Sequence, residues 1–127
     1  MPEPAVPTPR EMEILKVLWE HGPCSVRDVY RYLSEDEDVA YNTVQTMLRI
    51  MEEPHKGLVK HHVDGRAFVY KAVYTREASV RGFLDRVFDG AAHELLLTLL
   101  RTERISQVEL DQLHSMIQDA RKRKASR

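Results

Sequence analysis

The 127-residue chain has one cysteine, no long apolar run and almost no net charge. The single Cys24 excludes an internal disulfide framework and cannot supply a cluster of thiolate metal ligands within one chain. The longest apolar run, residues 95–100, is interrupted by Thr98 and is far too short to cross a bilayer. The first residues also lack the basic and then apolar pattern of a secretion signal, so we expect a cytoplasmic protein.

The sequence also lacks the motifs of an enzyme. It has no glycine-rich phosphate-binding loop and no nucleophile with a base at an informative spacing. The adjacent His61 and His62 raise the question of a metal site, but neighbouring strand residues point to opposite faces and cannot easily bind one ion. We therefore predict no catalytic residues, no metal site and no cofactor.

A formal net charge of −1 argues against general binding to polyanions, so any contact with nucleic acid must depend on where the charges lie. Residues 54–76 hold five lysines and arginines and three histidines, against one acidic residue, Asp64. This region is locally basic. The acidic residues concentrate at residues 35–38, which we interpret as a solvated loop.

Hydrophobic spacing predicts three short helices in the first half of the chain. The first covers residues 9–21 and follows a capping box formed by Thr8 and Glu11. The second covers about residues 26–33, and the third covers about residues 41–53.

Two β-rich runs, residues 58–63 and 66–73, then flank the dipeptide Asp64-Gly65. Asp-Gly between such runs predicts a β-hairpin, because a type I′ turn needs positive φ at both central residues. Three helices followed by a hairpin are the element order of a winged helix-turn-helix domain. We therefore predict a mainly helical fold with a small β-hairpin wing, in which residues 1–75 form a winged-helix DNA-binding domain.

The third helix carries polar side chains opposite its apolar stripe. Asn and Gln can pair with adenine, Arg with guanine, and Thr with phosphate or a thymine methyl, so this face suits the major groove. In the hairpin, lysine and arginine side chains suit phosphate contacts beside the groove. The residues predicted to bind DNA are Asn42, Gln45, Thr46, Arg49, Lys60 and Arg66. A merely solvated helix face and a strand edge protected by charge are the alternatives.

Residues 76–127 are predicted to form further helices, with a capping box at Ser106 and Glu109. This segment is too apolar to stand alone in water and too small to sustain its own core, so we expect a helical dimerisation domain that packs against a second copy. Folding back on the N-terminal domain as a monomer is the alternative. The residues predicted to form the dimer interface are Phe83, Leu84, Val87, Leu96, Leu110, Leu113 and Ile117.

Several stretches of the sequence, taken together, are characteristic of one known protein family. They are PREMEILKVLW at 9–19, VRDV at 26–29, AYNTVQTMLR at 40–49, KGLV at 56–59 and GRAFVY at 65–70, with FDG at 88–90 and ISQVEL at 105–110 as weaker matches. With these stretches the chain resembles the penicillinase-repressor family, which includes methicillin-resistance and copper-responsive repressors. Pro54-His55 departs from the family pattern by lengthening the link between the third helix and the hairpin.

The resemblance implies a dimeric repressor on palindromic promoter sites, with Thr43, Gln45 and Thr46 in the DNA-contacting region. In the β-lactam-responsive members a membrane sensor-protease system leads to cleavage in the C-terminal helices. By position the cut falls near Thr98-Leu99, where the best-known members have Asn-Phe. The copper-responsive branch carries a C-terminal cysteine motif, and no cysteine follows Cys24, which excludes that route.

These observations predict a transcriptional repressor that binds palindromic operator DNA as a homodimer and competes with RNA polymerase. One alternative is a winged-helix protein-interaction module without sequence-specific DNA binding. Another is a repressor that senses a small ligand in an apolar pocket between the C-terminal helices.

Overall fold

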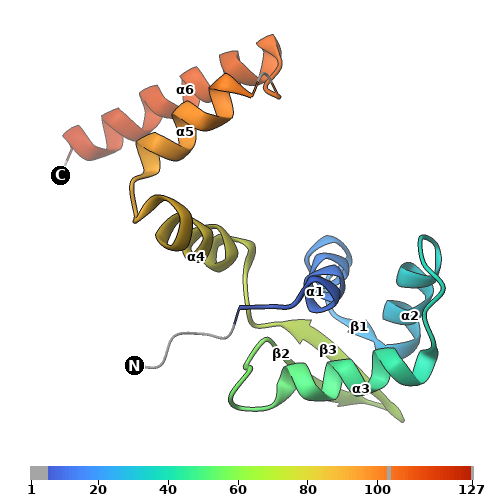
Figure 1. Cartoon of the computed structure of the whole chain (residues 1–127). Coiled ribbons are helices and arrows are strands. Elements are labelled where there is room, and N and C mark those ends of the chain that lie inside the picture. The colour runs from blue at the N-terminus through green and yellow to red at the C-terminus, as the bar shows by residue number, and fades with distance from the viewer. Residues whose placement is uncertain (1–5, 103, 127) are drawn as a thin grey trace. The chain divides into compact units, whose positions relative to one another are not determined.

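The computed structural model describes residues 6–102 and 104–126. The first five residues of the predicted DNA-binding domain, and Glu103 and Arg127 of the predicted dimerisation domain, lie outside the described residues. The chain forms two compact units, one up to Gly82 and one from Phe83 onward (Figure 1). The predicted mainly helical winged-helix fold is confirmed.

The N-terminal unit begins with helices at the places where the sequence carries capping signals. Its elements are α1 (Pro9–His21), β1 (Cys24–Ser25), α2 (Val26–Ser34), α3 (Tyr41–Glu52), β2 (Val59–Asp64) and β3 (Ala67–Ala72). At the start of α1 the Thr8 hydroxyl accepts the backbone N–H of Glu11, and the Glu11 carboxylate accepts the backbone N–H of Thr8. The Ser25 hydroxyl likewise caps α2. The three predicted helices are therefore confirmed.

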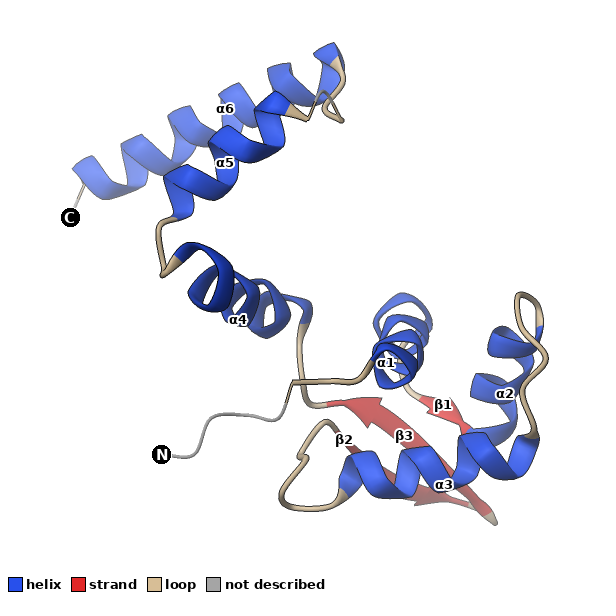
Figure 2. Cartoon of the chain, viewed as in Figure 1, coloured by secondary structure: helices blue, strands red, loops and turns tan. Residues whose placement is uncertain are grey.

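The strands form one antiparallel sheet in the order β1-β3-β2, with β2 at an edge (Figure 2). The hairpin of β2 and β3 is paired from Val59↔Ala72 to Asp64↔Ala67. The sequence did not predict β1, because a strand of two residues is too short to show an alternating pattern.

The hairpin turn lies one residue later than predicted. Because Asp64 pairs with Ala67, the two loop residues are Gly65 and Arg66. Gly65 has a φ of 64°, and Asp89 is the only described non-glycine residue with positive φ. The predicted type I′ turn centred on Asp64-Gly65 is therefore wrong, since glycine occupies the first loop position and supplies the positive φ there. The shift places Arg66 in the turn itself.

The core of the N-terminal unit forms where the apolar stripes of the three helices meet the sheet. Its fully buried side chains are Ile14, Leu15, Val29, Val44, Leu48, Met51, Leu58 and Tyr70. The indole N–H of Trp19 donates to the backbone carbonyl of Tyr74 at 2.9 Å, which ties α1 to the segment after β3. This packing gives α3 a fixed position, with one face inward and the other in solvent.

A partly buried ion pair holds the loop between α3 and β2. The Lys56 ammonium lies 3.1 Å from the carboxylate of Glu11, whose side chain is only 6% exposed. Burial raises the pKa of Glu11, but the hydrogen bonds from Thr8 and the hydrogen bond and charge of Lys56 outweigh it, so the pKa lies below its ordinary value. The loop is therefore anchored to the first turn of α1.

The C-terminal unit and the segment before it are helical. They contain α4 (Arg76–Phe88), α5 (Ala92–Arg101) and α6 (Gln107–Ala125), and the predicted Ser106–Glu109 capping box is present. None of the described residues in these three helices is buried. No described helix is both long and apolar enough to cross a membrane.

Candidate nucleic-acid interface

The outward face of α3 presents the polar side chains that the sequence assigned to DNA. Val44, Leu48 and Met51 are completely buried against the core, which turns the other side of the helix to solvent. The exposed residues on α3 include Asn42, Thr43, Gln45, Thr46 and Arg49. These side chains are therefore free to reach a partner.

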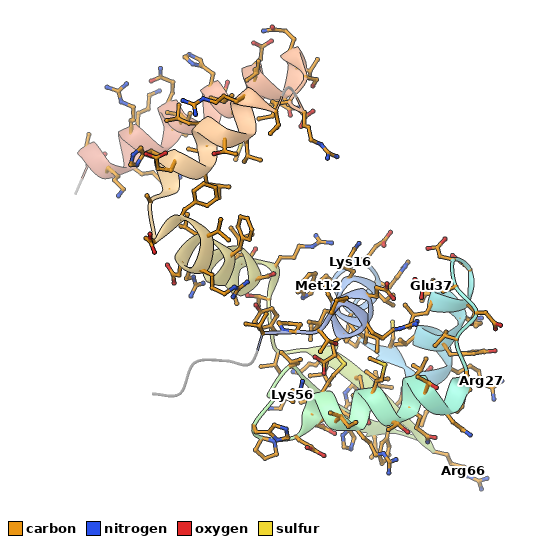
Figure 3. All side chains as sticks on the ribbon, viewed as in Figure 1. Met12, Lys16, Arg27, Glu37, Lys56 and Arg66 are labelled. Carbon is orange, nitrogen blue, oxygen red and sulfur yellow. The ribbon has the colours of Figure 1, made fainter. Side chains whose placement is uncertain are left out.

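A groove of about 680 Å³ runs between α3, the start of α2 and the wing tip. Its lining residues are Ser25, Val26, Arg27, Tyr41, Gln45, Arg49, Arg66, Ala67, Phe68 and Tyr70. Arg27 and Arg66 lie on the same side of the N-terminal unit (Figure 3). The groove thus joins the candidate recognition helix to the wing.

The groove is electrostatically suited to an anion. It carries an arginine from each of three elements, Arg27 on α2, Arg49 on α3 and Arg66 in the wing turn. None of the three forms an ion pair with another residue in the described part of the chain. The N-terminus of α2, whose backbone N–H groups carry a partial positive charge, lies at the same groove. Phosphate oxygens would meet charge and hydrogen-bond donors there.

The floor of the groove is uncharged. Burial raises the pKa of the Tyr70 hydroxyl, the charge of Glu52 raises it further, and the charge of Arg49 lowers it in part. The pKa of Tyr70 therefore lies above its ordinary value, and Tyr70 is a neutral phenol at physiological pH. Beside it Phe68, 46% exposed, adds an apolar surface.

The structure brings together only some of the predicted DNA-binding residues. Gln45, Arg49 and Arg66 line the groove. Lys60 lies outside it, on the face of β2 opposite His61, where it is paired in register with Lys71. Two like charges directly opposite each other destabilise a hairpin, so this pair would gain from an anion.

Arg27, Tyr41 and Phe68 in the groove were missed by the sequence analysis. Arg27 had a usable signal, because it is the second residue of a helix capped by Ser25. Phe68 had none, since an aromatic residue in an alternating strand is normally assigned to the core.

A carboxylate at the end of α3 makes hydrogen bonds to β2 of the wing. Glu52, the last residue of α3, accepts the backbone N–H of His61 at 2.8 Å. The ring Nδ1 of His61 lies 2.6 Å from each oxygen of the same carboxylate. The ring also stacks on Phe68, with the centroids 4.2 Å apart.

The residues predicted for the dimer interface lie on α4, α5 and α6. Phe83 and Val87 on α4 are 43% and 55% exposed. Leu96, Leu110, Leu113 and Ile117 line a mainly apolar groove of about 600 Å³ between α5 and α6. Leu84 is partly buried, and Leu99 of the Thr98-Leu99 pair is exposed on α5.

Comparison with known proteins gives the family. The family model described as Penicillinase repressor matches residues 7–119. The penicillinase repressor of Bacillus licheniformis is 30% identical over 119 residues, which cover 90% of this chain and 91% of that protein. The transcriptional regulator BlaI of Mycobacterium tuberculosis is 32% identical, over 81% of this chain and 76% of that protein.

Among solved structures, the chain is similar to the monomeric form of Bacillus licheniformis BlaI in complex with the blaP half-operator. The two are 32% identical with a TM-score of 0.48, and the match covers 60% of this chain and 93% of that chain. The family match alone spans most of the sequence. The chain therefore belongs to the penicillinase repressor family and is a DNA-binding transcriptional repressor rather than an enzyme.

Proposed function

We propose that this repressor acts as a homodimer on palindromic operator DNA in the cytoplasm, with α3 in the major groove and the wing on the flanking backbone. The observation that carries the proposal is the groove in which Gln45 and Arg49 of α3 lie beside Arg66 of the wing. The helix carries side chains that can hydrogen-bond to base edges, and it lies next to a positively charged turn. These are the features of proteins that recognise DNA sequence in the major groove.

The proposed DNA residues divide into two roles. Asn42, Gln45 and Arg49 would pair with base edges, each good bidentate pair discriminating by about 1 to 3 kcal/mol. Thr43 and Thr46, on the same exposed face, would bond phosphate or touch thymine methyls. Lys60, Arg66 and the newly found Arg27 would contact phosphates, which positions the protein without reading sequence.

A second copy is the proposed partner of the C-terminal helices, so that residues 1–75 bind DNA and residues 76–127 dimerise. Large apolar side chains are more than 40% exposed on each of α4, α5 and α6, an amount that a folded monomer rarely leaves in water. The interface would contain Phe83, Leu84, Val87, Leu96, Leu110, Leu113 and Ile117. Two copies would place two recognition helices about 34 Å apart, at half-sites one helical turn apart.

We predict that the repressor is released from DNA by one of two routes. In the first, a membrane sensor-protease system leads to a cut near Thr98-Leu99, which would separate α6 from the DNA-binding domain. In the second, release occurs without that cut. Treating the full chain with the activated protease and sequencing the fragments distinguishes the two routes.

Selection of bound sequences from a random duplex library, with the full chain at moderate salt, tests the proposal. We expect a palindrome whose half-sites lie about one turn apart. A single unpaired half-site would contradict the homodimer. Recovery of no motif would contradict operator reading and favour the protein-interaction module.

A further inference from the structure

α3 and the wing share buried core residues, and outside that core a single carboxylate links them by hydrogen bonds. Glu52 holds both the backbone N–H and the ring of His61, at 2.8 Å and 2.6 Å. Among the described residues, His61 is also the only hydrogen-bond partner of the Glu52 side chain. Because β2 is an edge strand, the carboxylate satisfies a backbone donor that would otherwise face water.

From His61 the contact continues into the DNA-facing groove. The ring stacks on Phe68 with 16° between the planes, and its centroid lies 5.4 Å from that of Tyr70. Phe68 and Tyr70 both line the groove that also holds Arg66. A change at Glu52 would therefore be transmitted to the groove through the His61 ring.

The Glu52–His61 contact also lies beside the link between α3 and β2. Residues 53–58 link α3 to β2. A flexible link alone would leave the hairpin free to shift relative to α3. The Glu52–His61 contact closes the link at its two ends, and the Lys56–Glu11 ion pair holds its middle.

The negative charge of Glu52 is unfavourable beside a groove that is proposed to bind phosphate. A carboxylate near a phosphate-binding groove repels DNA, and Glu52 lies close enough to Tyr70 for its charge to act on that hydroxyl. Its side chain is 27% exposed, so it is only partly screened by water. Retaining a repulsive charge at this place is explained if the carboxylate is needed to hold the wing.

We propose that Glu52 and His61 are positioning residues, which hold the wing at the distance from α3 that the DNA backbone requires. The inference rests on the proposed function of α3 and the wing. Neither residue needs to touch DNA. They act through Phe68 and through Arg66, two residues earlier in the chain.

The test uses the full chain and the operator recovered by selection, with the variants Glu52→Ala, His61→Ala and the double variant. Each single change should weaken operator binding about tenfold. The double variant should bind no more weakly than the weaker single variant, because both changes remove the same contact. The dependence of affinity on salt should fall toward that of Arg66→Ala, because a displaced wing no longer holds Arg66 on the phosphates.

Matched controls separate positioning from general damage. His55→Ala, at an exposed histidine outside the proposed DNA-binding residues, should bind as the unaltered chain does. Glu52→Gln keeps an acceptor oxygen and should recover part of the affinity even if Glu52→Ala lowers the melting temperature too far for use. Arg66→Ala should weaken binding and also reduce the salt slope by about one.

The outcomes distinguish this inference from the function on which it rests. Unaltered affinity in both single variants, additive losses in the double variant, or an unchanged salt slope for Glu52→Ala would overturn the positioning role alone. Absence of sequence-selective binding by the unaltered chain would overturn the proposed function and the positioning role together.

Discussion

The two units of this chain bury their apolar side chains to very different extents. In the N-terminal unit, Ile14, Val29 and Leu48 have no exposed surface. In the C-terminal unit, Val87, Leu100 and Ile117 are each at least 50% exposed, although all lie in well-formed helices. The C-terminal helices therefore form without the buried core that accompanies the helices of the N-terminal unit. The N-terminal unit has a buried core, and none of the described residues in α4, α5 and α6 is buried, which is why we propose that a second copy covers these helices.

Charging the exposed apolar face should give the largest effect. Leu113→Asp or Phe83→Asp places a carboxylate in the proposed interface, where its desolvation cost opposes dimerisation. We expect a monomer by light scattering and at least about a hundredfold weaker operator binding, since only one half-site is held per molecule. Gln112→Asp, at the exposed polar neighbour on α6, is the control and should leave the mass unchanged. A dimeric Leu113→Asp variant would refute the interface.

Truncating the buried face of α3 should have the next largest effect. Leu48→Ala removes a completely buried side chain, and we expect the free energy of unfolding to fall by about 2 to 5 kcal/mol in denaturant titrations. Ile50→Ala on the same helix is the control, because Ile50 is 39% exposed and should cost much less. Equal losses at the two positions would contradict the orientation of α3.

Single changes at the proposed DNA-binding residues should separate base reading from phosphate contact. Gln45→Ala or Arg49→Ala should relax the preference at particular base pairs by about 1 to 3 kcal/mol. Arg27→Ala or Lys60→Ala should instead weaken operator and random DNA alike and reduce the salt slope by about one. Lys16→Ala on α1, outside the groove, is the control. If every variant lost affinity equally for operator and random DNA, the assignment of separate base-reading and phosphate-contacting residues would be wrong.

The smallest effect is expected at the Glu11–Lys56 ion pair and depends on pH. The folded-state pKa of Glu11 lies below its ordinary value, so the unfolded chain binds the proton more tightly. The pair therefore stabilises the fold fully above the ordinary pKa of glutamate, and this contribution is lost as the pH falls through the folded-state pKa. Denaturant titrations of Glu11→Gln should show a weaker loss of stability in that acidic range. An identical pH profile would contradict the pair's contribution.

Local signals predicted the elements of the fold well. The capping boxes at Thr8 and Ser106 fixed helix starts because they depend on residues three apart, which a sequence displays directly. The turn was misplaced by one residue, since Asp-Gly is compatible with glycine in either loop position and the strand register decides between them. Contacts between elements were not predictable in the same way.

The groove shows why contacts between elements could not be predicted from the sequence. Gln45, Arg49 and Arg66 could be chosen from residue type and position, but Arg27 and Phe68 join them only through the packing of α2 and the hairpin on α3. The Glu52–His61 contact spans nine residues between a helix end and a strand, with no sequence period that relates them. Tertiary packing, rather than propensity, decides which side chains share the site.

Sedimentation of the full chain, with and without the selected operator, gives the number of copies in each species. We expect two chains of 14.8 kDa on each palindromic duplex, and two chains in the absence of DNA. A single chain per duplex, together with a single-chain mass in free solution, would contradict the claim that a second copy covers the C-terminal helices.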